Sequence, residues 1–406
     1  MAKIIPFKAV RPVRDKAHLI SSRPYYTYKK SLLKAKLDSN PFSFLHVINP
    51  EFKKGDKTKP NSIERFNAVS KEYKNFKENN FFIQDNSPCL YLYRQKSLHG
   101  VYTGIIAGAA VDDYKDNKIK KHENTIISRE NLFKKYLDIC NFHAEPVLLT
   151  YSISNRIKEL NNQVLSERPE YEFTTTDQKT HELWVIKDKA IVNELCEEFK
   201  GINDIYIADG HHRAASSLLY NNDNQNNHLS SYFLSLFIDK KDLKIFEFNR
   251  FINDISPLNS TSFLKQLEDC FNIKKVGNKY RNPENKKEFS LYIEKIWYLL
   301  EIKENILKNL NYKEQLNSQI VSDIILEPIL KIKDLRKDKR VEFISGELPI
   351  KNITNKVNKT PNSIAICLYP HDIEEIIKIA DQSETMPPKS TWIEPKLRSA
   401  ITIYEY

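Results

Sequence analysis

The chain has 406 residues, a net charge of +10 and only 8 glycines. Its glycines form neither the G-x-G-x-x-G pattern of dinucleotide-binding folds nor the G-x-x-x-x-G-K-[ST] pattern of P-loops, and the protein-kinase motifs are missing. These three classes of nucleotide site are therefore excluded. Many lysines lie beside glutamates, which favours solvated faces over a nucleic-acid surface.

Hydrophobic residues make up 40% of the chain, which is enough for a substantial core. Five scattered cysteines without a C-x-x-C pair fit reduced thiols. No apolar run has the length of a signal peptide or a membrane span. We therefore expect a cytoplasmic protein that has no membrane partner.

Residues 1–80 look irregular and partly helical, with a helix expected over 62–79. Two strands over 88–94 and 101–111 are predicted to form a hairpin. Further elements follow in chain order: a short strand over 118–121, a helix over 128–137 capped by Ser128, strands over 144–150 and 181–186, a helix over 189–199, a strand over 204–208 and a helix over 211–220.

Two more strands, over 232–238 and 243–251, are predicted to form a hairpin around a K-K-D turn. Residues 257–340 are expected to be rich in helix. A strand over 365–370, a helix over 372–382 and a final strand over 400–406 complete the chain. The sequence thus predicts an α/β (α+β) protein in three parts: an N-terminal segment over 1–80, a catalytic core over 81–251 and a helix-rich C-terminal region over 252–406.

The strongest candidate site is Asp209-Gly210-His211-His212-Arg213, between an apolar strand and a helix. The first turn of a helix has N–H groups without intrahelical acceptors and a partial positive charge, so it attracts anions. His212 and Arg213 add donors, Gly210 permits a sharp turn, and the Asp209 carboxylate suits Mg²⁺. In the alternative interpretation, Asp209 is only an N-cap and the histidines are surface residues. A polar cluster at this position favours the functional interpretation.

A second candidate is the segment K-K-H-E-N-T over 120–125. Glu123 is a candidate general base, and His122 is a candidate substrate or phosphate contact. Lys120 and Lys121 would steer an anion toward the site. Taken alone, the segment is more typical of an exposed charged turn.

Two further features are weaker. Gly100, Gly104 and Gly108 share one face of a predicted strand, where a helix or a ligand can approach the bare backbone. The proline-stiffened loop over 386–392 offers Lys389 and Ser390 as candidate substrate contacts. Simple packing of the tryptophan in this loop is the alternative.

Four segments together resemble a known family. The segments are I-A-D-G-H-H-R-A-A-S, V-D-D-Y-K-D-N-K-I-K-K-H-E-N-T, N-P-F-S-F-L-H-V-I-N-P-E and M-P-P-K-S-T-W-I-E-P-K-L. They are similar to the family catalogued as domain of unknown function 1015, over nearly the whole chain. The D-G-H-H-R element is also similar to the nucleotide site of the ParB/sulfiredoxin fold, whose relatives include kinases of free L-serine.

This resemblance implies a ParB/sulfiredoxin-like core of mixed sheet and helices that transfers phosphate from ATP or ADP to free L-serine, with Mg²⁺. It implies Asp209 and His212 as catalytic residues, Asp209 as the metal ligand, and Glu123 as the base that takes the serine hydroxyl proton. The nucleotide would contact Gly210, His211, His212, Arg213, Lys120 and Lys121. The amino acid would contact His122, Thr125, Lys389 and Ser390.

The chain departs from the family pattern at several points. Arg23-Pro24-Tyr25-Tyr26 stands where members have P-P-Y-D, so an acid is replaced at Tyr26. Ile126 replaces a frequent arginine, and Asn249-Arg250 replaces a His-Arg pair. These departures leave open a non-catalytic nucleotide-binding regulator, or a kinase of another hydroxylated metabolite. A ParB-like DNA-binding protein is the third alternative, although no helix-turn-helix is visible.

Overall fold

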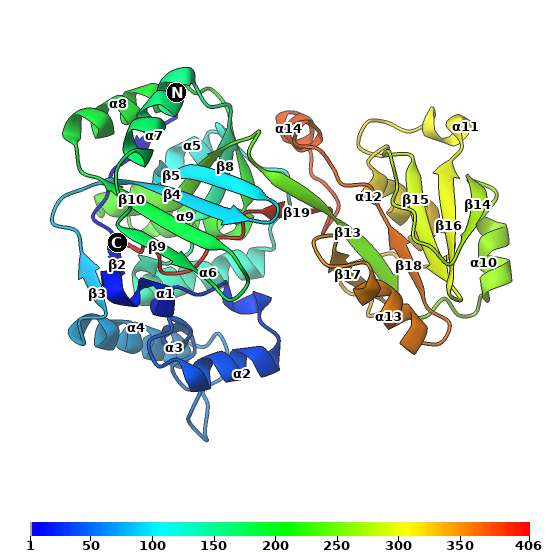
Figure 1. Cartoon of the computed structure of the whole chain (residues 1–406), viewed down its shortest axis with the longest axis horizontal. Coiled ribbons are helices and arrows are strands. Elements are labelled where there is room, and N and C mark those ends of the chain that lie inside the picture. The colour runs from blue at the N-terminus through cyan, green and yellow to red at the C-terminus, as the bar shows by residue number, and fades with distance from the viewer. Residues whose placement is uncertain (1) are drawn as a thin grey trace. The chain divides into compact units, whose positions relative to one another are not determined.

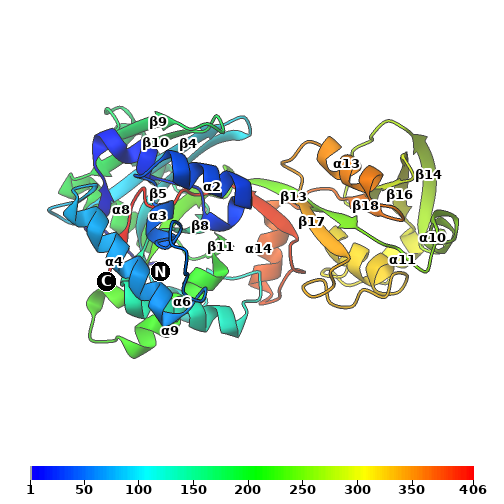
Figure 2. The same cartoon turned by 90° about the horizontal axis from the view of Figure 1, so that it is seen from below.

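The computed structural model describes residues 2–406 and separates them into two compact units. The first unit extends to Lys244 and also includes Pro395–Tyr406, and the second unit is Ile245–Glu394. The end of the chain therefore returns to the first unit, whereas the division made from the sequence kept 252–406 together. Both units combine helices with β-sheets, so the predicted mixed α/β class is confirmed (Figures 1 and 2).

The first unit contains most of the elements of the chain. Its strands are β1 (Ile4–Ile5), β2 (Val10–Pro12), β3 (Phe82–Gln84), β4 (Leu90–Ser97), β5 (Gly100–Ala110), β6 (Ile119–Lys120), β7 (Phe142–His143), β8 (Val147–Tyr151), β9 (Tyr171–Thr174), β10 (Thr180–Ile186), β11 (Ile205–Asp209), β12 (Tyr232–Asp239) and β20 (Tyr404–Glu405). Its helices are α1 (Ala17–Ile20), α2 (Lys30–Ser39), α3 (Leu45–Ile48), α4 (Ile63–Glu78), α5 (Val111–Lys115), α6 (Ile127–Cys140), α7 (Asn155–Leu165), α8 (Lys189–Lys200) and α9 (His211–Asp223), with short 3-10 turns η1 (Arg14–Lys16), η2 (Tyr25–Thr27) and η3 (His228–Ser231).

A nine-stranded mixed sheet forms the centre of this unit. Its strands follow the order β6-β11-β8-β12-β5-β4-β10-β9, and β1 pairs with β5. The β11–β6 and β12–β8 pairs are parallel, whereas β4 and β5 form the predicted antiparallel hairpin. The parallel pairing of β6 and β11 matters for the site, because the segments that follow these two strands leave the same edge of the sheet.

The glycines of β5 are explained by close packing of neighbouring strands. A Cβ at Gly104 would lie 2.4 Å from the backbone oxygen of Phe237 in β12, and one at Gly108 would lie 2.9 Å from the Ile5 side chain in β1. Any side chain at Gly104 would therefore push β12 away. At Gly104 and Gly108, the structure supports the packing interpretation.

Two hydrophobic cores stabilise the first unit. One lies between the large sheet and helices α7, α8 and α9, with Leu160, Leu195 and Phe199 among its fully buried side chains. The other joins α3, α4 and α6 to the small strands β2 and β7 and includes Phe44 and Phe142. Burial of a large apolar side chain contributes about 1.5–3 kcal/mol, so these cores hold the helices against the sheet.

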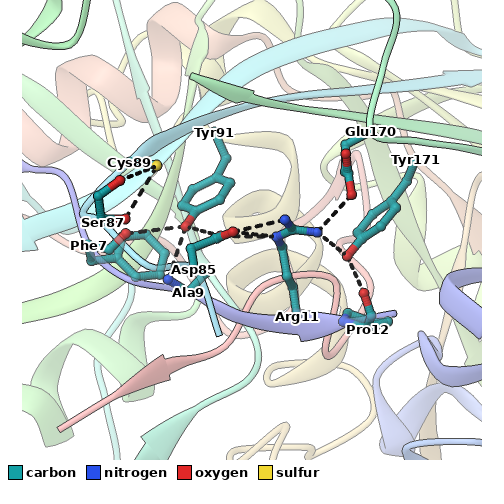
Figure 3. A network of polar contacts seen from close by, with 10 residues as sticks. All are labelled: Phe7, Ala9, Arg11, Pro12, Asp85, Ser87, Cys89, Tyr91, Glu170 and Tyr171. Atoms are coloured by element: carbon teal, nitrogen blue, oxygen red, sulfur yellow. Dashed lines mark hydrogen bonds and ion pairs between the residues drawn. The ribbon is translucent and has the colours of Figure 1, made fainter. Parts of the chain in front are cut away.

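A buried ion pair links β2 to the rest of the first unit (Figure 3). The Nε and Nη2 atoms of Arg11 donate to the Asp85 carboxylate at 3.0 and 2.8 Å, and Nη1 donates to Glu170 and to the Tyr171 hydroxyl. Tyr91 donates its hydroxyl to Asp85 at 2.8 Å. Every charged group of this network thus has a partner.

The second unit has a seven-stranded sheet of order β14-β16-β15-β18-β13-β17, with β19 paired to β13. Its strands are β13 (Lys244–Ile252), β14 (Phe271–Gly277), β15 (Glu288–Ile293), β16 (Ile296–Ile302), β17 (Val341–Ser345), β18 (Ile364–Cys367) and β19 (Thr391–Glu394). Its helices are α10 (Ser260–Leu267), α11 (Glu304–Leu307), α12 (Asn317–Ile320), the π-helix η4 (Val321–Leu326), α13 (Lys351–Lys359) and α14 (Ile373–Asp381).

The second unit departs from the sequence prediction in two ways. The helices α10, α12 and η4 occur within the expected helix-rich stretch, but β14, β15 and β16 also lie there. The predicted hairpin of 232–238 and 243–251 is wrong: β12 pairs with β5 and β8, while β13 pairs with β17 and β18. The K-K-D turn instead leads the chain from one unit into the other. Across residues 2–406, no helix combines the length and the apolar character that crossing a membrane requires.

Candidate functional site

The D-G-H-H-R run forms a sharp turn between β11 and α9, as predicted. Gly210 is the N-cap of α9 with φ +99°, in the left-handed region that favours glycine, and no side chain caps this helix. Its backbone oxygen accepts from the Arg213 N–H at 2.9 Å. Asp209 is the last residue of β11. The Asp209 side chain is therefore available for a role other than capping.

A cluster of opposite charges surrounds this turn. The Asp209 carboxylate lies 3.4 Å from Arg213 Nη2 and 3.5 Å from Lys396 Nζ. Arg213 also donates from Nη1 to Glu145 at 3.0 Å, and the Ser399 hydroxyl donates to the other Glu145 oxygen at 2.7 Å. The two cations are about one-sixth exposed and Asp209 about one-third exposed. Two cations thus lie beside a helix N-terminus, an arrangement that attracts a polyanionic group.

Lys396, Glu145 and Ser399 were not identified from the sequence. Lys396 and Ser399 belong to the C-terminal segment that returns to the first unit, where Ser399 and Ser22 bond through their backbones. The proline-rich tail was singled out for Lys389 and Ser390, but its last lysine, Lys396, is the one that lies at Asp209. The position of Lys396 beside Asp209 depends on the path of the chain end. No local pattern in the sequence predicts that path.

The H-E element lies against the same turn. His122 follows β6 and is buried, and its backbone N–H donates to His211 Nε2 at 3.5 Å. The two imidazoles meet edge to face, with ring centroids 4.5 Å apart. Glu123 Oε2 lies 3.9 Å from His211 Nδ1, and its side chain is 45% exposed. The structure thus brings together the two motifs that the sequence analysis ranked highest.

His211 lies inside the protein and does not project toward solvent. Burial, followed by the nearby charges of His122 and His212, lowers the pKa of His211 well below its usual value, so the ring is neutral at pH 7. Because Nε2 accepts the His122 N–H, the ring proton resides on Nδ1, which faces the Glu123 carboxylate. His211 therefore lies between the two motifs, bonded to the His122 backbone and 3.9 Å from the Glu123 carboxylate.

The remaining candidate residues occupy different environments. Lys120 pairs with Asp204 at 2.7 Å, at the beginning of β11 and about 16 Å from its end by strand geometry. The Thr125 hydroxyl donates to Glu130 in the first turn of α6. His212 and Lys121 are more exposed, and both lower the pKa of His211. Lys120 and Thr125 thus make local contacts, with Asp204 and Glu130 respectively.

Lys389 and Ser390 belong to the second unit. Lys389 Nζ lies 5.6 Å from the centre of the Phe248 ring. Ser390 is buried, and its hydroxyl contacts Ser318 Oγ at 3.0 Å and the Pro387 oxygen at 2.7 Å. Ser390 thus has a packing environment within its own unit. The side chain of Tyr26, where an acid was expected from the family pattern, lies outside what the structure describes.

The donor set at the turn suits a cation that is shared with a phosphate ligand. Within the described part of the chain, no group of three or more His, Cys, Asp and Glu side chains is arranged to hold a metal. Mg²⁺ in nucleotide sites is commonly bound by one or two carboxylates together with phosphate oxygens and water. The partly exposed Asp209 carboxylate can supply such a ligand. The described side chains at the turn do not suffice to bind a metal ion without phosphate oxygens and water.

Several solved structures are similar to this chain, at low sequence identity and low TM-score. A C-terminally truncated SbnI from Staphylococcus aureus is 12% identical with a TM-score of 0.37, over 73% of this chain and 87% of that one. A free serine kinase in complex with AMP is 13% identical with a TM-score of 0.33, over 73% and 92%. A conserved hypothetical protein from Pyrococcus furiosus is 14% identical with a TM-score of 0.34, over 74% and 94%. No curated protein matches the sequence.

Membership of a family rests on sequence. The sequence model of the protein family of unknown function DUF1015 matches residues 4–327, which is most of the chain and includes β11, the Gly210 turn and the H-E segment. The chain belongs to this family.

Proposed function

We propose that this protein is a phosphotransferase that uses ATP or ADP to phosphorylate the hydroxyl group of free L-serine. One observation carries the proposal: Glu123 and the cationic turn at Gly210 converge on His211. A phosphotransferase needs a site for polyphosphate beside a carboxylate that can accept a hydroxyl proton. This turn offers both within one unit of the fold.

The nucleotide phosphates would bind at the N-terminus of α9. Arg213 and Lys396 now contact the carboxylates of Asp209 and Glu145, so phosphate oxygens would replace these carboxylates in part. Both cations would then offset the charge that spreads over the transferred group. Mg²⁺ held by Asp209 and phosphate oxygens would neutralise further charge. Phosphate binding at this turn would thus exchange ion pairs that Arg213 and Lys396 already make, with Mg²⁺ as the one added cation.

Glu123 would act on the acceptor. The serine hydroxyl oxygen forms the new bond to phosphorus while the bond from phosphorus to the bridging oxygen breaks, which releases ADP from ATP or AMP from ADP. The hydroxyl proton would pass to Glu123, whose Oε2 lies 3.9 Å from His211 Nδ1. Half exposure of the Glu123 side chain leaves room for a small acceptor.

The test is a direct search for the product. The protein is incubated with L-serine, Mg²⁺ and either ATP or ADP, and O-phosphoserine is measured by mass spectrometry. We expect Glu123→Gln to lower turnover by at least about 100-fold, the scale of general-base catalysis, while nucleotide affinity is retained. Glu159→Gln is the matched control, because Glu159 is an exposed carboxylate on α7 whose partner is Arg156.

The outcomes separate the proposed kinase from its main alternative. Absence of O-phosphoserine with both donors would refute the serine kinase. Nucleotide binding without turnover of any hydroxylated metabolite would favour a binding regulator, in agreement with the replaced acid at Tyr26. Full activity of Glu123→Gln would remove Glu123 as the base.

A further inference from the structure

Arg250 is a fully buried cation in the second unit. It lies near the C-terminal end of β13, opposite Phe343 of β17 and Ile366 of β18, and its exposure is 0%. Its guanidinium carbon is 4.7 Å from the centre of the Phe343 ring, and Nη1 donates to the backbone oxygen of Phe248. The surroundings of the guanidinium are therefore mainly apolar.

The other two nitrogens of Arg250, Nε and Nη2, are buried and have no hydrogen-bond partner among the described residues. These two atoms form one edge of the guanidinium, and that edge matches the two oxygens of a carboxylate or phosphate. The same edge binds a carboxylate in three other arginines of this chain: Arg11 with Asp85 (Figure 3), Arg94 with Glu182 and Arg340 with Asp338.

The charge of Arg250 is not balanced by the protein. Burial alone lowers the pKa of Arg250 to about 9, with no contribution from a neighbouring charge, so the side chain remains a cation at pH 7. A buried charge without a counter-ion is strongly unfavourable, and a buried donor without an acceptor adds to that cost. Arg11 shows how this chain normally satisfies such a group, with carboxylates on two sides.

We propose that Arg250 anchors a second anion-binding site, in which a small oxyanion accepts hydrogen bonds from Nε and Nη2. The ligand class is a carboxylate or phosphate group, since both present two oxygens at the spacing of this edge. Lys389, whose Nζ lies over the Phe248 ring, supplies a second cation beside the residue that accepts from Arg250. Because Nε and Nη2 are covered, the anion enters only when neighbouring side chains move. This site does not depend on the proposed kinase activity.

The experiment uses the full-length chain with Arg213→Met, which removes the guanidinium of the Gly210 turn. Thermal unfolding is followed in sodium phosphate and in sodium acetate, each against sodium chloride at equal ionic strength. A ligand of the folded state raises the midpoint progressively with the logarithm of its concentration. We expect such a rise with phosphate, acetate or both, and the effective salt identifies the oxyanion.

Two variants on this background test the role of Arg250. Arg250→Met removes the charge at similar length, and we expect the anion-dependent rise to disappear. The control Arg156→Met removes an exposed arginine of α7 and should keep the rise. An equal response of the Arg250→Met protein and its parent would overturn the proposal, as would no response to either anion.

A second measurement covers the case in which Arg250→Met does not fold. The Nε–H resonance of Arg250 is followed by ¹⁵N NMR in the Arg213→Met protein and assigned by its loss in Arg250→Lys. We expect a shift in this resonance during titration with the oxyanion that raised the midpoint. A resonance that neither anion moves would refute binding at this edge.

Discussion

Replacing Gly210 with alanine tests how the turn between β11 and α9 positions Arg213. A Cβ at Gly210 would lie 2.8 Å from Arg213 Nη2 and 2.9 Å from Nε, and the backbone φ there is +99°. Both distances are shorter than real contacts of a methyl group, and the guanidinium is the flexible end of its side chain. We expect Arg213 to move away from Asp209 and Glu145 while the backbone keeps its path.

The loss of stability can be worked from two contributions. A side chain forced into the left-handed region costs about 1–2 kcal/mol. Each partly exposed ion pair of Arg213 is worth about 0.2–1 kcal/mol. With two such ion pairs, the free energy of unfolding of the first unit should therefore fall by about 1–4 kcal/mol. Nucleotide affinity should fall too, because the guanidinium no longer lies over the N-terminus of α9.

Alanine substitutions at two other glycines separate the backbone cost from the displacement of Arg213. Gly277 has φ +103° with no described atom within 4 Å of an added Cβ, so Gly277→Ala measures the backbone cost alone. Gly55 has open space and no positive φ, so Gly55→Ala measures the substitution itself. Urea unfolding and calorimetric titration with ADP are the assays. If Gly210→Ala lost no more stability than Gly277→Ala and bound ADP like the parent, the inferred link between Gly210 and Arg213 would be refuted.

Two more predictions concern stability. Arg11→Met should lower the free energy of unfolding, measured in urea, by about 3–5 kcal/mol, because it leaves the buried Asp85 carboxylate without its cation. The double variant Arg11→Met with Asp85→Leu should recover part of this loss. No recovery in the double variant would contradict this account. The folded-state pKa of His143 and of His181 is lowered from 6.5 to about 3, mainly by burial, so the unfolded chain takes up protons first and stability is lost as pH falls below 6.5. At pH 4.5 each histidine should cost about 3 kcal/mol; a His181→Gln protein with the same pH dependence as the parent would refute this.

Local patterns in the sequence predicted most of the elements, and the failures have a common physical cause. Two apolar runs on either side of the K-K-D turn identified β12 and β13 correctly as strands. The pattern does not state which strand pairs with which, and two strands joined by a short turn are usually a hairpin. Here β12 lies between β8 and β5 and forms its backbone hydrogen bonds with both, so neither edge of β12 is free to pair with β13. The hairpin prediction failed because pairing is decided by long-range packing.

The distinction between local sequence patterns and long-range packing also applies to the candidate site. Asp209, His211 and Glu123 were identified because each lies beside a strand end in a polar run with its own sequence signal. The contact between the two runs follows from the parallel pairing of β6 and β11, which the local pattern of the sequence does not reveal. Lys396 and Glu145 carry no such signal. Their roles depend on a C-terminal segment that pairs β20 with β7 and brings Lys396 to Asp209 from far along the chain.

The charge balance of the turn gives a reason for this arrangement. Arg213 and Lys396 are matched by the carboxylates of Asp209 and Glu145, so the two cations are held in place without a ligand. Preorganised cations lower the entropy lost when a phosphate binds, but the carboxylates that hold them compete with that phosphate. In the proposed phosphate site, some affinity is thus exchanged for fixed geometry. Arg250 represents the opposite case, in which a cation is buried beside an aromatic ring and the edge formed by its Nε and Nη2 has no carboxylate to displace.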